Sequence, residues 1–169
     1  MDPKRLRKIV LSAMFCALVF AATWIAIPVV IGNVNLGDGV LLLCAWTLGG
    51  PWAAVAAALG ATLTDLVGGY ASYAPGTFII KALMAAVAIA LFKLLPRLGV
   101  HHRLSRILSA AGAEMVMILG YFVYEALFLG YGLGAAASVP FNALQGAFAI
   151  VISNLVYELI AKAGLKFDE

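Results

Sequence analysis

IVLSAMFCALVFAATWIAIPVVI, residues 9–31, decides the fold class because it contains no charged side chain. A helix rises about 1.5 Å per residue, so a helix of this length would measure roughly 35 Å, enough to cross a lipid bilayer. The rest of the chain has the same character: 64% of its 169 residues are hydrophobic and only 11% are charged. Soluble domains average about 25% charged residues. The sequence therefore predicts an integral membrane protein.

Further apolar runs follow the first, and loop-forming residues separate them. Gly49-Gly50-Pro51 is a strong helix break, so 39–50 and 52–69 are expected to form a hairpin whose first arm is too short to span the bilayer comfortably. We predict an all-α integral membrane bundle of six transmembrane helices. It forms a single domain, 1–169, with helices at about 9–31, 39–50, 52–69, 76–94, 107–129 and 141–163.

The basic side chains predict the orientation of the bundle, because Lys and Arg near short loops mark the cytoplasmic side. Ten of the eleven lie on one side of the six-helix bundle, and the opposite loops, 33–38, 70–75 and 130–140, contain none. Both termini are therefore predicted to be cytoplasmic, and the net charge of +3 does not indicate a nucleic-acid partner. A five-helix alternative, with 39–69 re-entrant, would place basic loops on both sides. The ten residues are Lys4, Arg5, Arg7, Lys8, Lys93, Arg97, Arg103, Arg106, Lys162 and Lys166.

Lys81 is the basic residue that this orientation leaves unplaced, in the middle of TFIIKALM (77–84). It lies roughly 7 Å below the outer end of its helix, and polar side chains from other helices are expected near the same depth. Charged groups inside a membrane usually face the bundle interior and mark a functional site. A few polar groups among aromatic walls are typical of a small-molecule site. We predict an outward-facing binding pocket formed by Asn35, Asp38, Asp65, Tyr73, Lys81, Tyr121, Glu125, Asn142 and Gln145.

Structural explanations stay open for several of these residues. Lys81 can form an ion pair with Glu125 or Asp65 instead of contacting a ligand. Asn35 and Asp38 can be turn residues, because Asn and Asp bond their own backbone in Gly-containing loops. The tyrosines, taken singly, also fit an interfacial belt.

Glu114 raises a second functional possibility. It precedes Glu125 by three helical turns and lies on nearly the same face. Two such acids would suit a proton-coupled secondary transporter or a small channel. A hydrogen-bonded structural glutamate is the other reading of Glu114.

The first helix carries small residues at a regular spacing. Ala13, Ala17 and Ala21 recur every four residues on one face. Small residues at this spacing let helices approach closely in lipid. The face is therefore either packed inside the bundle or a docking surface for another membrane protein.

Three stretches of the chain resemble the substrate-binding S components of energy-coupling factor (ECF) vitamin transporters, in the branch with riboflavin-, hydroxymethylpyrimidine- and pyridoxine-type members. The resemblance covers nearly the whole chain and is most specific at NLGD (35–38), DLVGGYASYAP (65–75), FIIK (78–81), YEA and FNALQG. The stretches are VNLGDGVLLLCAWTLGGPWAAVAAALGATLTDLVGGYASYAPGTFIIKALMA (34–85), GYFVYEALFLGYG (120–132) and VPFNALQGAFAIVISNLVYEL (139–159).

This resemblance implies a substrate-binding domain in the bacterial cell membrane that captures a vitamin or vitamin precursor near its outer face. It also implies docking through an alanine motif, matched by Ala13, Ala17 and Ala21, onto a transmembrane coupling (T) subunit that works with two ATP-binding cassette ATPases. The loaded protein would then topple in the membrane and release its ligand inward. The resemblance does not fix which vitamin is bound.

No enzymatic motif is present in the sequence. It lacks a phosphate-binding GxxxxGK[ST] loop, a GxSxG elbow and an HExxH helix, so ATP hydrolysis is expected only in partner subunits. Cys16 and Cys44 lie in apolar runs without the spacing of metal ligands, so no metal site and no cofactor are expected in this chain.

Overall fold

The computed structural model describes residues 2–28 and 33–164, and most of them are helical. Six α-helices are present in this part of the chain, together with a short β-hairpin, a π-helical turn (η1) and a 3-10 helix (η2). The elements are α1 Pro3–Trp24, β1 Ala26–Pro28, β2 Asn33–Asn35, α2 Gly37–Thr47, α3 Gly50–Val67, α4 Ala74–Arg97, α5 His102–Val123, η1 Tyr124–Phe128, η2 Gly132–Ala137 and α6 Val139–Lys162.

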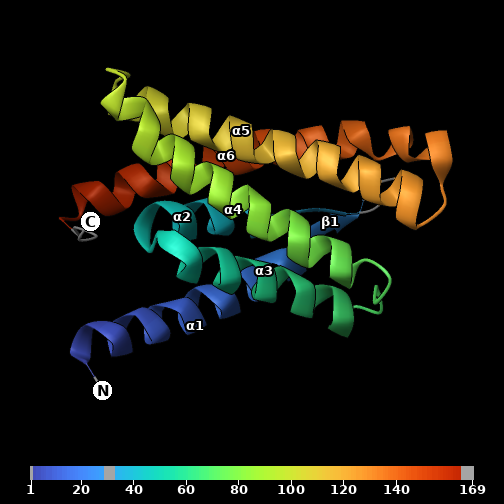
Figure 1. The fold of residues 1–169 in the computed structure, drawn as a ribbon, viewed down its shortest axis with the longest axis horizontal. Helices are drawn as coiled ribbons and strands as arrows, with labels where there is room; N and C mark the ends of the chain where they lie inside the picture. Colours follow the sequence, from blue (N-terminus) through green and yellow to red (C-terminus); the bar gives the residue numbers. More distant parts are fainter. Residues whose placement is uncertain (1, 29–32, 165–169) are drawn as a thin grey trace.

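The short helix α2 lies at the centre of the bundle, where it contacts α1, α3, α4 and α6 (Figure 1). α1 and α3 lie on one side of α4, and α5 lies on its other side. Leu41 and Leu42 of α2, Met84 of α4 and Met117 of α5 are fully buried between these helices. The core is therefore built around the one helix that is too short to cross a membrane.

The predicted helix break between α2 and α3 is confirmed. Gly49 and Gly50 both have positive φ, near 62° and 63°, a backbone conformation that favours glycine. Pro51 follows in the first turn of α3, where a missing N–H leaves no intrahelical hydrogen bond unmade. The chain can therefore reverse within two residues, and α2 stays short.

The predicted helix at 9–31 is wrong at both ends. The observed helix, α1, starts at Pro3, because Asp2 caps it by accepting a hydrogen bond from the Lys4 N–H. It stops at Trp24, because Pro28 and the β-branched residues before it favour extended backbone. Ala26–Pro28 instead pairs antiparallel with Asn33–Asn35. Positions 29–31 of the predicted helix, like Lys166, lie outside the described residues.

The basic segment between α4 and α5 is also more helical than expected. α4 begins at Ala74 and runs on through Pro96 to Arg97, while α5 begins at His102 instead of 107. His101 caps α5, because its ring Nδ1 accepts a hydrogen bond from the Arg103 N–H at 3.3 Å. Histidine is not a usual N-cap residue, so this helix start is hard to predict from the residue types alone.

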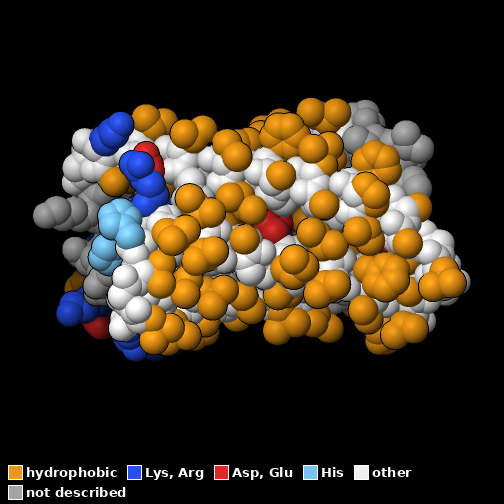
Figure 2. Space-filling model, turned by 90° about the horizontal axis from the view of Figure 1, so that it is seen from above, with side chains coloured by type: hydrophobic (Ala, Val, Ile, Leu, Met, Phe, Trp, Pro, Cys, Tyr) orange, Lys and Arg blue, Asp and Glu red, His pale blue; other side chains and the backbone are white. Residues whose placement is uncertain are grey.

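The outer surface has the character of a membrane protein. Five helices of the described chain are long and apolar enough to cross a membrane, and α2, with 11 residues, is shorter. Hydrophobic side chains cover the face in Figure 2, and Lys, Arg and His side chains gather at one end of it. α1 begins and α6 finishes at the same end of the bundle (Figure 1). This arrangement agrees with the orientation predicted from the basic residues.

Candidate ligand-binding site

A cavity of about 820 Å³ lies at the end of the bundle formed by the loops that lack Lys and Arg. All six helices and the β-hairpin contribute to its lining, and Tyr70 and Phe141 add aromatic walls. The cavity brings together all nine residues predicted for the pocket, which are Asn35, Asp38, Asp65, Tyr73, Lys81, Tyr121, Glu125, Asn142 and Gln145.

A continuous hydrogen-bond network forms the floor of the cavity. Lys81 Nζ donates to Asp38 Oδ1, and the Gln145 amide donates to Asp38 Oδ2 at 2.6 Å. Gln145 Oε1 in turn accepts from the backbone N–H of Asn35 at 3.0 Å and from its side-chain amide at 3.2 Å. Asn35 Oδ1 accepts from the Gly37 N–H at 2.9 Å. The network joins β2, α2, α4 and α6, so it holds the elements around the cavity in fixed positions.

The partner of Lys81 differs from both partners that the sequence suggested. It forms its salt bridge with Asp38, and neither Glu125 nor Asp65 pairs with it. The reason is that α2 begins at Gly37, two residues earlier than predicted, which places Asp38 in a buried first helical turn facing α4. A carboxylate there is also favoured by the helix dipole. Asp38 is therefore not a turn residue, whereas Asn35 does bond the backbone of its own turn.

Tyr121 and Thr77 cover the ion pair. The Lys81 ammonium lies 5.4 Å from the centre of the Tyr121 ring, within the range of a cation–π contact. The Tyr121 hydroxyl and Thr77 Oγ1 are hydrogen-bonded at 3.0 Å. Sequence reasoning missed Thr77, although it precedes Lys81 by four residues and so lies on the same helical face.

Glu125 forms a second polar centre on the cavity wall, in the π-helical turn η1. Its Oε2 accepts from the Ser138 hydroxyl at 2.6 Å, and its Oε1 accepts from the Tyr73 hydroxyl at 3.4 Å. Burial, the Glu125 carboxylate and Tyr131 raise the pKa of the Tyr73 phenol, so Tyr73 stays a neutral donor. Ser138 was missed because nothing in the small-residue stretch around it indicates chemistry. π-Turns within helices are rare and frequently occur at functional sites.

Asp65 reaches the cavity from α3. Its Oδ2 is buried and has no hydrogen-bond partner among the described residues. A buried acceptor without a donor is costly. Asp65 therefore keeps one unpaired carboxylate oxygen, which is shielded from the cavity as well as from solvent.

Glu114 lies outside the cavity lining. It is only 3% exposed, and neither carboxylate oxygen has a hydrogen-bond partner in the described part of the chain. It packs against Gly146, where an added Cβ would lie 3.2 Å from Glu114 Oε2. The hydrogen-bonded structural role considered for Glu114 is therefore wrong. Glu125, the other acid of the proposed pair, does form hydrogen bonds, with Tyr73 and Ser138.

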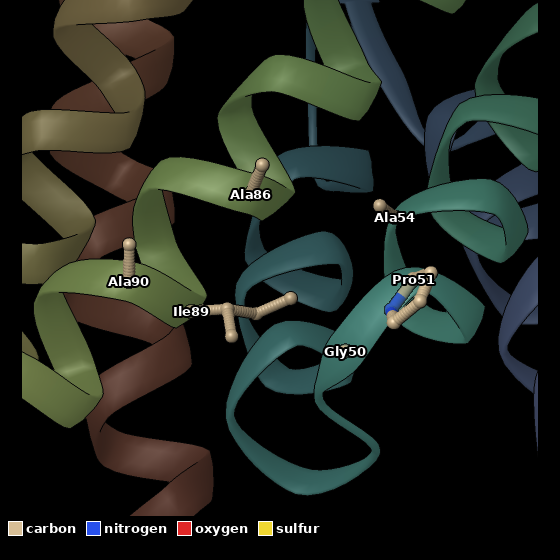
Figure 3. Close-up of a pocket in the computed structure, with 6 residues that line it drawn as sticks. All are labelled: Gly50, Pro51, Ala54, Ala86, Ile89 and Ala90. Carbon is tan, nitrogen blue, oxygen red and sulfur yellow. The ribbon is translucent and has the colours of Figure 1, made fainter.

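A second, smaller pocket of about 240 Å³ lies between α3 and α4 (Figure 3). Its lining contains no polar side chain and consists of Gly50, Pro51, Ala54, Ala86, Ile89 and Ala90. Without directional groups this pocket cannot orient a ligand, so we consider only the larger cavity as the site.

Ala13, Ala17 and Ala21 are exposed along α1. The inward side of α1 packs against α3, where an added Cβ on Gly60 would lie 2.5 Å from the Cys16 carbonyl oxygen and 2.9 Å from Val19 Cβ. Packing within the bundle is therefore the wrong explanation for the alanine spacing. The three alanines leave a smooth face on the outside of α1.

Comparison with known proteins identifies the family. The model of the family "ECF-type riboflavin transporter, S component" matches residues 4–162. A solved structure described as the S component of a bacterial ECF transporter superposes with a TM-score of 0.75 at 21% identity, covering 96% of this chain and 99% of that chain, which shows a common fold. No curated protein matches the chain. The predicted six-helix membrane bundle is confirmed, and this chain belongs to the family of ECF-type riboflavin transporter S components.

Proposed function

We propose that this chain captures riboflavin, or a vitamin precursor of similar size and polarity, from outside the cell. The observation that carries the proposal is the convergence of nine polar and aromatic residues from separate elements on one cavity. A volume of about 820 Å³ lies within the usual range of roughly 300–1,000 Å³ for small-molecule sites. The cavity lies at the end without Lys or Arg, which the orientation rule places outside.

The lining suits a flat heterocycle with polar substituents. Tyr70, Tyr73 and Phe141 offer aromatic faces against which a planar ring can stack. Asn142 and the exposed edge of the Asn35–Gln145 network offer directional hydrogen bonds. Selectivity follows because a ligand that lacks the matching groups would leave buried polar atoms unpaired.

Delivery of the ligand requires partners, since a transporter's substrate-binding subunit is not an enzyme and this chain has no ATP-binding loop. We propose that the exposed face of Ala13, Ala17 and Ala21 docks onto a transmembrane coupling subunit attached to two ATPases. Small side chains let two helices approach closely in lipid, where packing drives association. ATP hydrolysis in the complex then drives the loaded subunit to topple and release the vitamin inward.

Binding by the isolated protein tests the first part of this proposal. The purified chain should quench riboflavin fluorescence without nucleotide, and Asn142→Ala should weaken binding by at least about tenfold. Leu155→Ala is the matched control, because Leu155 lies on the same helix α6 but is 59% exposed on the outside. Mass spectrometry of molecules released on denaturation would identify a different vitamin if riboflavin does not bind.

Uptake assays separate this function from the proton-coupled alternative. Transport should require co-expression of the coupling subunit and the ATPases. Uptake by the lone chain in liposomes, driven by a pH gradient, would refute the S-component function and favour a carrier that uses Glu114 and Glu125.

A further inference from the structure

The small apolar pocket between α3 and α4 is a groove on the outside of the bundle. Pro51, Ala86 and Ala90, which line it, are exposed. The groove exists because α3 and α4 face each other here mainly with alanine and glycine, whose small side chains leave the space between the two helices unfilled (Figure 3). We call it the α3–α4 groove. Its position on the side of a membrane bundle exposes it to lipid.

One end of the α3–α4 groove is basic. Lys93 follows the groove residue Ile89 by four positions and Arg97 follows Lys93 by four, so both lie on the face of α4 that lines the groove. An added Cβ on Gly49, next to the groove residue Gly50, would lie 4.0 Å from Lys93 Nζ. Lys93 and Arg97 are exposed, and neither forms a salt bridge with another described residue. Both cations are therefore available to an anion from outside the chain.

No carboxylate offsets this charge along the two helices that form the groove. α4 contains no Asp or Glu, and the acid of α3, Asp65, comes fifteen residues after Gly50, roughly 22 Å along the helix. α3 also begins at Gly49 without a side-chain cap, so its first amides and its helix dipole add positive potential. The end of the groove therefore attracts an anion, whereas its length suits hydrocarbon.

The basic end of the groove lies at the level expected for lipid headgroups. Lys and Arg side chains gather at one end of the molecule, the end predicted to be cytoplasmic (Figure 2), and Lys93 and Arg97 lie in the last two turns of α4. Trp52, in the first turn of α3, is 40% exposed, and tryptophan is enriched at membrane–water interfaces. Anionic lipids of the cytoplasmic leaflet present their phosphates at this level.

We infer that the α3–α4 groove binds one anionic phospholipid of the cytoplasmic leaflet. An acyl chain lies against Ala54, Ala86 and Ala90, and the headgroup phosphate pairs with Lys93 and Arg97. The lining alone cannot orient a ligand, so the two cations set the orientation, while the hydrocarbon chain needs no hydrogen bond. Basic pockets between transmembrane helices on the cytoplasmic side hold anionic headgroups in this way. An apolar helix of a partner protein would fill the groove without using the cations at its end.

Native mass spectrometry of the purified full chain in detergent tests the inference. Dioleoyl phosphatidylglycerol and dioleoyl phosphatidylcholine have the same acyl chains and differ in headgroup charge, so each is titrated and binding of the first lipid is quantified. The wild type should prefer phosphatidylglycerol by about 25-fold, because each of two cations near an anionic lipid is worth about fivefold in affinity. Lys93→Gln combined with Arg97→Gln should abolish the preference.

Two further variants assign the effect to the groove. Lys4→Gln combined with Lys162→Gln is the matched control, because it removes two charges from the same end of the molecule but from α1 and α6, and it should keep the preference. Ala90→Phe keeps both cations and fills the groove, so it should bind both lipids several-fold less tightly. Thermal unfolding of each variant in detergent checks that it is folded.

Three results would overturn the inference. The first is equal affinity of the wild type for the two lipids. The second is a preference that survives removal of Lys93 and Arg97, or that the control variant loses to the same extent. The third is normal lipid binding by Ala90→Phe together with failure to assemble with the coupling subunit, which would assign the groove to a partner helix.

Discussion

Replacing Lys81 by Met should strongly destabilise the protein, because it leaves the Asp38 carboxylate buried without its cation. Lys81 is 6% exposed and Asp38 is 2% exposed, so water cannot replace the lost partner. Breaking a buried ion pair costs about 3–5 kcal/mol. The Gln145 amide still donates to Asp38 in the variant, so we expect the lower end of this range, about 3 kcal/mol.

The converse change, Asp38→Asn, should cost a similar amount. It leaves the buried Lys81 ammonium without its carboxylate partner, with the Tyr121 ring and the Glu114 side chain near it. The double variant, Asp38→Asn with Lys81→Met, removes both charges and should recover about 2 kcal/mol relative to the sum of the single changes. It should nevertheless bind riboflavin poorly, because the floor that positions Gln145 has been rebuilt.

Equilibrium unfolding in mixed micelles with increasing SDS, followed by tryptophan fluorescence, measures these changes. The control is Arg103→Met, because Arg103 is 66% exposed where it pairs with Glu158. A surface pair is worth about 0–1 kcal/mol. Single changes at Lys81 and Asp38 that cost no more than this control, or that add without coupling, would refute the buried-pair argument.

Three further predictions follow from other contacts. Glu114→Gln should leave the free energy of unfolding unchanged or raise it slightly, because neither carboxylate oxygen has a partner among the described residues. Chemical denaturation measures this free energy. If the variant binds its ligand normally but loses uptake, the result would support proton coupling through Glu114. Gly76→Ala should lower the thermal midpoint and weaken ligand binding, because its Cβ would lie 2.6 Å from the Tyr124 ring, whereas Gly134→Ala meets nothing within 4 Å and should have little effect. Ala17→Trp should leave ligand binding unchanged and block uptake by the complete complex, because Ala17 lies on the exposed face of α1; loss of binding would show that the alanine face is not a docking surface.

Several features of the fold and the site follow from the sequence because a bilayer makes charge informative. An embedded charge is expensive, so Lys81 and Glu125, placed well inside apolar runs, were expected to face the interior. The depth of each polar residue below the outer end of its helix then predicts which residues of separate helices lie at the same level. The nine residues predicted in this way line one cavity. The helix break at Gly49-Gly50-Pro51 is equally predictable, because glycine and proline favour particular local backbone conformations.

Which of these residues bond one another was beyond the sequence. The partner of Lys81 depends on α2, whose start at Gly37 turns Asp38 toward α4, and a shift of two residues would point Asp38 elsewhere. The short hairpin at Ala26–Pro28 was hidden for a related reason: apolar strand and apolar helix look alike in a membrane sequence, where no alternation with polar residues separates them.

The sequence by itself determined the membrane class, the end of the bundle at which basic side chains gather and the set of residues that lines the cavity, because these depend on where along the chain a charge or a break occurs. Only the tertiary structure decided that Lys81 neutralises Asp38 and leaves Asp65 and Glu125 facing the cavity. The physical reason is that an ion pair forms over a few ångströms, and those distances are set by how helices far apart in the chain rotate and pack against one another.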